Sequence, residues 1–412
     1  MAEGLEDRRP PVILSVAIFV VFAGTVYTSI NLPQGLAPVD PVILGVCLYS
    51  LLAMTHRGSP ATSGFVRLLP WFWCILLGSF LGMAGVGIPA WATSNLVRTV
   101  FALLTFVCLW HILIAARLQW YALAGTLAGF TFTCGMLIAQ SGGARGQAYF
   151  PHANYAGHYC AMAAVVLIAA ARRWYLKLLA LAGLLIALQT TSSFGAMAMS
   201  VAMLTVYVVR ALTRNTAILA TGLAILAIGG LFLATPQAAD LVPEDGTSWT
   251  ISETISEQRF DRSQSGRLKI WGDALEAFRE SPLGVGPDGV RQREVAVLNG
   301  FYLEIHSDPL GYLVERGVIG LIGFIGLWAT LFAVARKNGV ARVLIVGLLV
   351  SGLFRETMHY RHMWSLLALG FAVDHLRSRR EEAAEDADEP DEPDPVPAPL
   401  APEDRYFPGV AR

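Results

Sequence analysis

Residues 302–320 read Y-L-E-I-H-S-D-P-L-G-Y-L-V-E-R-G-V-I-G, and they join the longest polar segment of the chain to a hydrophobic run. Pro309 has no backbone N–H, so it suits the first position of a helix. Asp308 precedes it and is a good N-cap, because its carboxylate can accept hydrogen bonds from the unpaired amides of a first turn. This pattern places His306 and Ser307 immediately outside the N-terminus of a hydrophobic helix.

The N-terminus of a helix attracts anions, because its free amides and the helix dipole carry partial positive charge. The same field disfavours a protonated imidazole, which indicates that His306 is a neutral proton acceptor. The junction is therefore a candidate place for a phosphate group and a base to meet. The same residues are equally compatible with an interfacial histidine that only caps a membrane helix.

The rest of the chain has the composition of a membrane protein. Of its 412 residues, 55% are hydrophobic and 15% are charged, against roughly 25% charged residues in soluble domains. Apolar runs of about 18 to 20 residues recur along the sequence, which is typical of transmembrane helices. We predict an all-α, polytopic integral membrane protein with about twelve transmembrane helices. The predicted spans are 12–30, 40–55, 68–88, 96–116, 120–140, 153–171, 174–189, 192–209, 216–234, 309–335, 340–354 and 363–375.

Lysine and arginine residues set the predicted orientation. When the N-terminus is placed in the cytoplasm, nearly every cytoplasmic turn carries basic residues, as the positive-inside rule requires. We therefore expect both termini in the cytoplasm, and one large external loop, residues 235–308, within a transmembrane domain of residues 1–376. Residues 377–412 are rich in Pro, Ala and acidic residues and are predicted to form a disordered cytoplasmic tail.

Several arginines fall on the external side against this bias. Arg98 lies at the external end of the fourth span, Arg145 lies in the loop before the sixth, and Arg355 and Arg361 flank the last external turn. Further basic residues, among them Arg267, lie in the long loop. Each one alone is compatible with a solvated loop charge, but together they indicate a basic external cavity.

The long loop also contains a predicted amphipathic helix at residues 267–280, which ends at Ser281-Pro282. Its predicted apolar stripe consists of Leu268, Trp271, Leu275 and Phe278. We expect this helix to lie on the outer membrane surface or to cap the helical bundle.

A basic site at the membrane edge with one well-placed histidine suits a lipid-linked phosphate. Arginine binds phosphate oxygens bidentately, and a departing diphosphate needs its charge neutralised. The sequence has no Gly-rich nucleotide loop, no HExxH or cysteine cluster, and no serine nucleophile elbow. The residues alone therefore indicate a transferase or a binder that acts on a lipid phosphate at the outer face.

The motif around His306 resembles the signature of the bacterial O-antigen ligase and polymerase superfamily. That signature is a His followed by Asn, Ser or Gln, then a spaced Gly-x-x-Gly, which His306-Ser307 and Gly317 to Gly320 match. Glu315 also stands where the family tends to have it. The pattern R-x-x-x-W that begins at Arg267, followed by S-P-L-G-V-G-P, is similar to the segment before the family's catalytic His.

A second similarity lies in the middle of the chain. Arg145 followed by Pro151-His-Ala-Asn154 is similar to the family's Arg, Pro-Asn pattern at the start of a mid-chain span. The chain departs from the family at Phe194, where many members carry the Arg of a Ser-Arg-Gly. Another arginine, Arg98 or Arg145, is expected to supply that charge.

The resemblance implies a glycosyltransferase of the bacterial inner membrane whose active site faces the periplasm. It would transfer a glycan from undecaprenyl diphosphate to a sugar hydroxyl of lipid A-core oligosaccharide, with inversion and without a metal or other cofactor. His306 would orient or deprotonate the acceptor, and Arg267, Arg145 and Arg98 would hold the diphosphate. Supporting roles would fall to Asn154, Ser307, Glu315, Gly317 and Gly320. The expected partners are these two glycolipids and membrane lipids, and not nucleic acid.

Three other functions remain open from the sequence. A polysaccharide polymerase of the same superfamily would join repeat units, but polymerases often have two large external loops. A protein O-oligosaccharyltransferase is a further relative that often carries an extra soluble domain. A lipid-linked glycan transporter or flippase usually has internal repeats, and no clear repeat is found.

Overall fold

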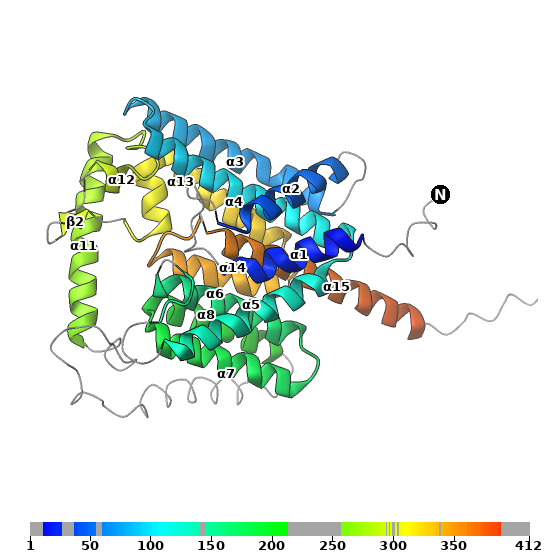
Figure 1. The fold of residues 1–412 in the computed structure, drawn as a ribbon. Helices are drawn as coiled ribbons and strands as arrows, with labels where there is room; N and C mark the ends of the chain where they lie inside the picture. Colours follow the sequence, from blue (N-terminus) through cyan, green and yellow to red (C-terminus); the bar gives the residue numbers. More distant parts are fainter. Residues whose placement is uncertain are drawn as a thin grey trace, which may run out of the picture. The chain divides into compact units, whose positions relative to one another are not determined.

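The computed structural model (Figure 1) describes a helical protein. The described residues are 11–26, 37–54, 60–140, 146–150, 152–212, 257–293, 295, 297–298, 301–302, 305–337, 339–358 and 360–388. Side chains at 60–62, 194, 210–212, 257–267, 297–298, 301–302 and 383–388 are not among them.

Helices make up nearly all of the regular structure in the described part of the chain. They are α1 (Val12–Gly24), α2 (Asp40–Met54), α3 (Pro60–Ala84), α4 (Ala90–Ala115), α5 (Gln119–Ala139), α6 (Ala153–Ala170), α7 (Trp174–Thr191), α8 (Phe194–Leu212), α11 (Glu257–Glu280), α12 (Gly289–Gln292), α13 (Asp308–Val334), α14 (Val340–Gly352) and α15 (Arg361–Asp388). Strands β1 (Val297–Leu298) and β2 (Phe301–Tyr302) form a short antiparallel hairpin in which Val297 pairs with Tyr302. The predicted all-α class is confirmed.

The helices also confirm a multi-pass membrane protein. Within the described residues, six helices are long and apolar enough to cross a membrane: Ser63–Ala84 of α3, and α4, α5, α6, α7 and α13. Four shorter apolar helices are α1, α2, Gly195–Val209 of α8, and α14. The predicted total of about twelve spans stays a prediction, and the span predicted at 216–234 lies outside the described residues.

Close packing of α3 against α13 is made possible by glycines on both helices. A Cβ placed on Gly78 would lie 2.7 Å from the Gly320 nitrogen, and one placed on Gly82 would lie 2.6 Å from the Glu315 carbonyl oxygen. Further along, a Cβ on Gly323 would lie 2.8 Å from the Ile75 nitrogen. Small residues let helix backbones approach closely in membranes, where apolar burial alone does not drive association.

Aromatic side chains join α4, α13 and α15 in the core. Phe106 lies 5.6 Å from Trp364 between ring centroids, and Trp364 stacks on Trp328 at the same centroid distance. The carboxylate of Asp374 on α15 accepts hydrogen bonds from the Val340 and Ala341 amides at 2.6 and 2.9 Å. It thereby caps the N-terminus of α14.

The amphipathic helix exists, but it is longer than predicted, and only Trp271 and Phe278 of the four predicted stripe residues pack against the rest of the protein. It begins at Glu257 rather than at residue 267, and among its described side chains those of Ile270 and Ala274 are buried. Leu268 and Leu275, the other two residues of the predicted apolar stripe, are 57% and 40% exposed. Ile270 and Ala274 pack with Val285, Val290, Ile305 and Val314. The helix therefore packs on the start of α13, at the end of the bundle where α12 lies (Figure 1).

The predicted domain boundary at residue 376 lies within helix α15 and stays a prediction. By their internal contacts, Met1–Asp374 forms one compact unit and His375–Arg412 a second. Helix α15 continues to Asp388, so the first residues of the predicted disordered tail are helical. The remainder of that predicted tail, 389–412, lies outside the described residues.

Candidate functional site

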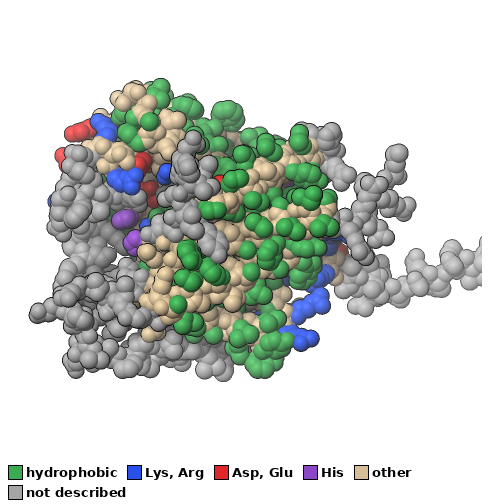
Figure 2. All heavy atoms as spheres, viewed as in Figure 1, with side chains coloured by type: hydrophobic (Ala, Val, Ile, Leu, Met, Phe, Trp, Pro, Cys, Tyr) green, Lys and Arg blue, Asp and Glu red, His purple; other side chains and the backbone are tan. Residues whose placement is uncertain are grey.

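Segments that were predicted to lie on one side of the membrane meet at one end of the bundle. The Gly146 amide, before α6, donates a hydrogen bond to the Thr190 carbonyl at the end of α7. Tyr155 on α6 and Tyr360, in the turn between α14 and α15, have ring centroids 4.4 Å apart. In Figure 2, charged and histidine side chains gather near α11, α12 and the start of α13, whereas hydrophobic side chains cover much of the remaining described face.

His306 lies in a sharp turn at the junction with α13. Its φ angle is 55°, in the left-handed region, and its side chain is half-buried. The carbonyl before it, on Ile305, accepts a hydrogen bond from the Trp271 indole nitrogen of α11 at 3.0 Å. Ser307 follows as a buried, extended N-cap whose side chain makes no capping hydrogen bond. The prediction that His306 and Ser307 stand just outside a helix is confirmed.

The predicted N-cap role of Asp308 is wrong by one residue, because α13 begins at Asp308 and Pro309 is its second residue. The Asp308 carboxylate is buried and accepts hydrogen bonds from the amide and the hydroxyl of Thr357, at 2.8 and 2.5 Å. Thr357 lies in the α14–α15 turn. The carboxylate therefore attaches the start of α13 to that turn instead of closing its own helix.

Helix α13 has a kink at Gly317, whose φ and ψ angles are 66° and −172°. The kink leaves carbonyl groups available on one side of the helix. The Val285 and Gly286 amides donate to the carbonyls of Val314 and Glu315, at 3.0 and 2.9 Å. The segment that follows α11 is therefore bonded to α13 at the kink.

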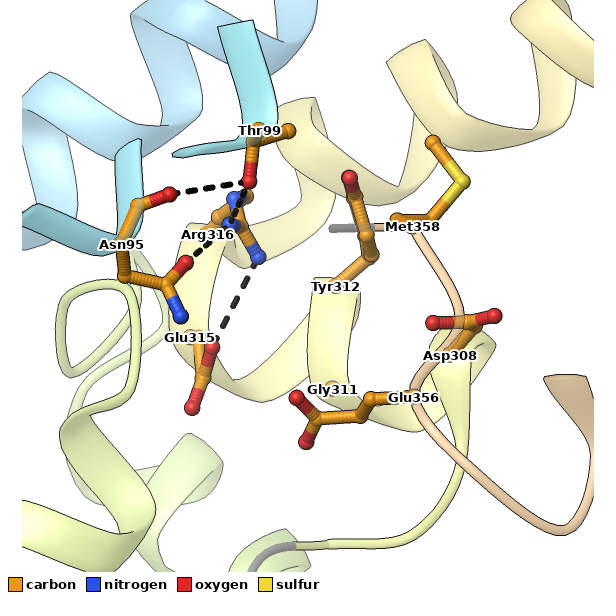
Figure 3. Close-up of a pocket in the computed structure, with 9 residues that line it drawn as sticks. All are labelled: Asn95, Thr99, Asp308, Gly311, Tyr312, Glu315, Arg316, Glu356 and Met358. Carbon is orange, nitrogen blue, oxygen red and sulfur yellow. Dashed lines mark hydrogen bonds and ion pairs between the residues drawn. The ribbon is translucent and has the colours of Figure 1, made fainter. Parts of the chain in front are cut away.

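A small polar pocket lies beside this kink (Figure 3). It is lined by Asn95 and Thr99 of α4, by Asp308, Gly311, Tyr312, Glu315 and Arg316 of α13, and by Glu356 and Met358 of the α14–α15 turn. In Figure 3, Asp308 lies on the far side of Tyr312 from Arg316, whereas Glu356 lies beside Gly311, between Glu315 and Asp308. The pocket thus combines three carboxyl groups with one guanidinium group.

The guanidinium of Arg316 is held on several sides although only 4% of the residue is exposed. Its nitrogens donate to the Ser79 hydroxyl at 3.1 Å and to the Asn95 side-chain oxygen at 3.0 Å. The Glu315 carboxylate lies 3.6 Å away, and the Tyr312 ring lies 4.4 Å from the guanidinium carbon. Arg316 therefore ties α13 to α3 and α4, with its charge matched by a carboxylate.

The hydroxyl group of Tyr312 is buried and has no hydrogen-bond partner among the described residues. A buried hydroxyl without a partner loses its hydration, which costs about 1–3 kcal/mol. With three carboxyl groups close by, this donor and acceptor set matches a ligand that carries several hydroxyl groups.

The predicted site residues divide between this pocket and other places. Glu315 lines the pocket, Gly317 forms the kink, and Gly320 lies against α3. Asn154 lies in the first turn of α6, where its backbone N–H donates a hydrogen bond to His152 Nδ1 at 3.2 Å. Arg98 has an exposed side chain on α4 and is not a lining residue of the pocket.

Two of the predicted diphosphate ligands are not described in the structure. Arg145 lies outside the described residues, and Arg267 lies within α11 but its side chain is not described. Their roles stay predictions. Among the described residues, no group of three or more His, Cys, Asp or Glu side chains is arranged to hold a metal ion.

Sequence analysis missed the role of Arg316 in the pocket. A signal was present, because a charged residue inside a long apolar helix is costly and almost always has a packed partner. Arg316 is followed by an uninterrupted apolar run to Thr330, so it could have been singled out from its position.

The fold and the pocket define a multi-pass helical membrane protein with a polar site at one end of its bundle. Residues 176–325 match the family model described as O-Antigen ligase. The chain is also similar to an O-antigen ligase of Pseudomonas aeruginosa, with 32% identity over 127 residues. That similarity covers 27% of this chain and 31% of the relative, so it spans about a third of the relative's length. These matches confirm the resemblance to the O-antigen ligase family.

Proposed function

We propose that the protein is an O-antigen ligase of the bacterial inner membrane. It transfers a glycan from undecaprenyl diphosphate to a sugar hydroxyl of lipid A-core oligosaccharide at the periplasmic face. The observation that carries this proposal is the family match at residues 176–325, because this segment contains His306, the kink at Gly317 and most of the residues that build the polar pocket.

In the proposed reaction, the acceptor hydroxyl oxygen attacks the anomeric carbon of the donor glycan. The bond between that carbon and the diphosphate oxygen breaks, and the configuration inverts. His306 takes the proton of the hydroxyl or orients it, and the diphosphate leaves with its electron pair. The half-buried position of His306 next to the buried start of α13 supports this role.

The pocket supports a role in binding the acceptor sugar. Carboxylates accept hydrogen bonds from sugar hydroxyls, and Asp308, Glu315 and Glu356 all line the pocket. The buried Tyr312 hydroxyl can donate to a sugar oxygen. The leaving diphosphate is bound by arginines, for which Arg98, Arg145 and Arg267 are the candidates, and their fixed charge takes the place of a metal ion.

A strain that lacks this gene tests the proposal through its glycolipids. We expect lipid A-core without long glycan and an accumulation of glycan on undecaprenyl diphosphate, with both restored by the wild-type gene and not by His306→Ala. Loss of a polymerase would instead leave a single repeat unit on lipid A-core. Loss of a transporter would trap the lipid-linked glycan on the cytoplasmic side. An unchanged glycolipid profile in the deletion strain would refute the proposed function.

A further inference from the structure

A second buried arginine, Arg355, lies in the turn between α14 and α15. Only 8% of the residue is exposed. Its Nε donates a hydrogen bond to the Tyr360 hydroxyl at 3.2 Å, and its guanidinium carbon lies 4.2 Å from the centre of the Tyr155 ring. The Tyr360 hydroxyl in turn donates to the Tyr155 hydroxyl at 2.7 Å. Two neutral phenol groups therefore surround the guanidinium.

Arg355 differs from buried Arg316 and half-buried Arg361 at this end of the bundle in having no carboxylate partner among the described residues. Arg316 has Glu315 at 3.6 Å, and Arg361 pairs with Asp40. Among the described residues, no carboxylate lies within ion-pair distance of Arg355. The hydroxyls of Tyr360 and Tyr155 occupy at most two of the five guanidinium N–H donors, so at least three can serve another group.

The guanidinium is charged in this environment. Arginine keeps its proton at physiological pH even when it is buried. A buried charge without an opposite charge costs several kcal/mol. An anion beside Arg355 would remove that cost.

The surroundings of Arg355 add positive potential. Tyr155 lies in the first turn of α6, so the free amides of that helix N-terminus lie close to the guanidinium. Helix α8 also begins here, because a Cβ on Gly195 would lie 3.2 Å from His158 Nε2 and 4.0 Å from Phe354 Cβ. That His158 nitrogen is buried without a hydrogen-bond partner among the described residues. The start of two helices and an unmatched guanidinium thus converge on one turn.

We propose that Arg355 is the centre of an anion subsite that binds a phosphate group of a diphosphate ligand. Its identification with the donor's diphosphate rests on the proposed function. The subsite adjoins the polar pocket, because the next residue, Glu356, lines that pocket and Thr357 is hydrogen-bonded to Asp308. Asp308 lies two residues after His306. A diphosphate at Arg355 therefore lies at the same end of the bundle as the proposed base.

Thermal unfolding with inorganic pyrophosphate tests the subsite without any glycan. The purified full-length protein is placed in nanodiscs of phosphatidylcholine, and its melting temperature is followed as pyrophosphate is titrated. The variant is Arg355→Met, which removes the charge and keeps apolar volume. The matched control is Arg173→Met, because Arg173 also pairs with a tyrosine, Tyr175 at 2.8 Å, but is exposed on the turn before α7.

We expect pyrophosphate to raise the melting temperature of the wild type and of Arg173→Met. In Arg355→Met the apparent Kd for pyrophosphate should rise about 10- to 100-fold, because charge-assisted hydrogen bonds to the phosphate are lost. Without ligand, Arg355→Met should melt no lower than the wild type, because it no longer buries an unmatched charge. A purely structural arginine would give the opposite pattern, with a lower melting temperature and an unchanged response to pyrophosphate. That pattern, or the absence of any response in the wild type, overturns the proposal.

A second variant and a second membrane keep the result decisive. If Arg355→Met does not fold, Arg355→Gln is used, since it can still hydrogen-bond to Tyr360. A full pyrophosphate response in Arg355→Gln overturns the proposal.

Nanodiscs that contain phosphatidylglycerol distinguish binding of a lipid headgroup from binding of a diphosphate. If phosphatidylglycerol raises the melting temperature of the wild type but not of Arg355→Met, and pyrophosphate adds nothing, the ligand is a lipid headgroup. That result would reject the diphosphate as the ligand of this subsite. An Arg355-dependent pyrophosphate response in a protein whose deletion leaves the glycolipids unchanged would reject the ligase proposal and keep the subsite.

Discussion

Replacing Gly317 by alanine should destabilise the protein strongly. The φ and ψ angles of Gly317, 66° and −172°, belong to a region that only glycine populates readily. A Cβ at this position would also lie 2.8 Å from the carbonyl carbon and oxygen of Leu283 and from the Pro282 oxygen. All three atoms are backbone, so no side chain can rotate away to make room.

The magnitude follows from two separate contributions. Holding a non-glycine residue in such a conformation costs about 1–3 kcal/mol. Forcing an extra carbon into a packed contact costs about 1–3 kcal/mol more. The variant should therefore lose about 2–6 kcal/mol, which lowers Tm by at least roughly 4 °C. Any shift that relieves the contact would also disturb the hydrogen bonds from Val285 and Gly286, which would lower activity.

The assay is thermal unfolding of the detergent-purified variant, with Gly135→Ala as its control. Gly135 lies inside α5 and has nothing within 4 Å of an added Cβ. Alanine there should be neutral or stabilising, because glycine inside a helix costs roughly 0.5–1 kcal/mol relative to alanine. If Gly317→Ala melts at the temperature of Gly135→Ala and keeps its activity, the kink is not required and the reasoning is wrong.

Three further predictions concern the chemistry and the support of the site. His306→Ala should keep normal protein levels and lose about 10²- to 10⁴-fold in transfer rate, measured with purified protein and lipid-linked donor; an unchanged rate would assign His306 to helix capping. Asp308→Ala should lower both Tm and activity, because it leaves the buried amide and hydroxyl of Thr357 without their acceptor, at about 1–3 kcal/mol each. Thr357→Val removes only the hydroxyl and should have a smaller effect on Tm than Asp308→Ala, and the reverse order would contradict this account. Transfer should continue in excess EDTA, since arginines supply the positive charge, and loss of activity that Mg²⁺ or Mn²⁺ restores would reject this prediction.

The junction at His306 shows which structural features can be predicted from neighbouring residues alone. The side chains of Asp308 and Pro309 predict a helix start to within one residue, because capping and proline preferences depend on the backbone nearby. The kink nine residues later could not be predicted in the same way. Gly317 reads as one more residue of an apolar helix, and its unusual backbone angles depend on contact with Pro282 and Leu283, more than thirty positions earlier.

The packed face of α11 was predicted only in part, for a different reason. Leu268 and Leu275 form a helical stripe as regular as that of Ile270 and Ala274, so periodicity alone could not choose between them. In a soluble protein the larger side chains would be expected inside. Here Ala274 is fully buried and Leu268 is 57% exposed, whereas Trp271 of the predicted stripe is partly buried against the same cluster as Ala274.

The contacts of α11 connect its position to the geometry around His306. Trp271 binds the Ile305 carbonyl immediately before the histidine, and the segment after the helix donates two hydrogen bonds to α13 at the kink. His306 therefore lies between two attachment points of the same segment. Its left-handed backbone is a conformation that non-glycine residues rarely adopt without support from the surrounding structure. Both points depend on the place of α11, so the position of this helix helps to fix the backbone on either side of the histidine.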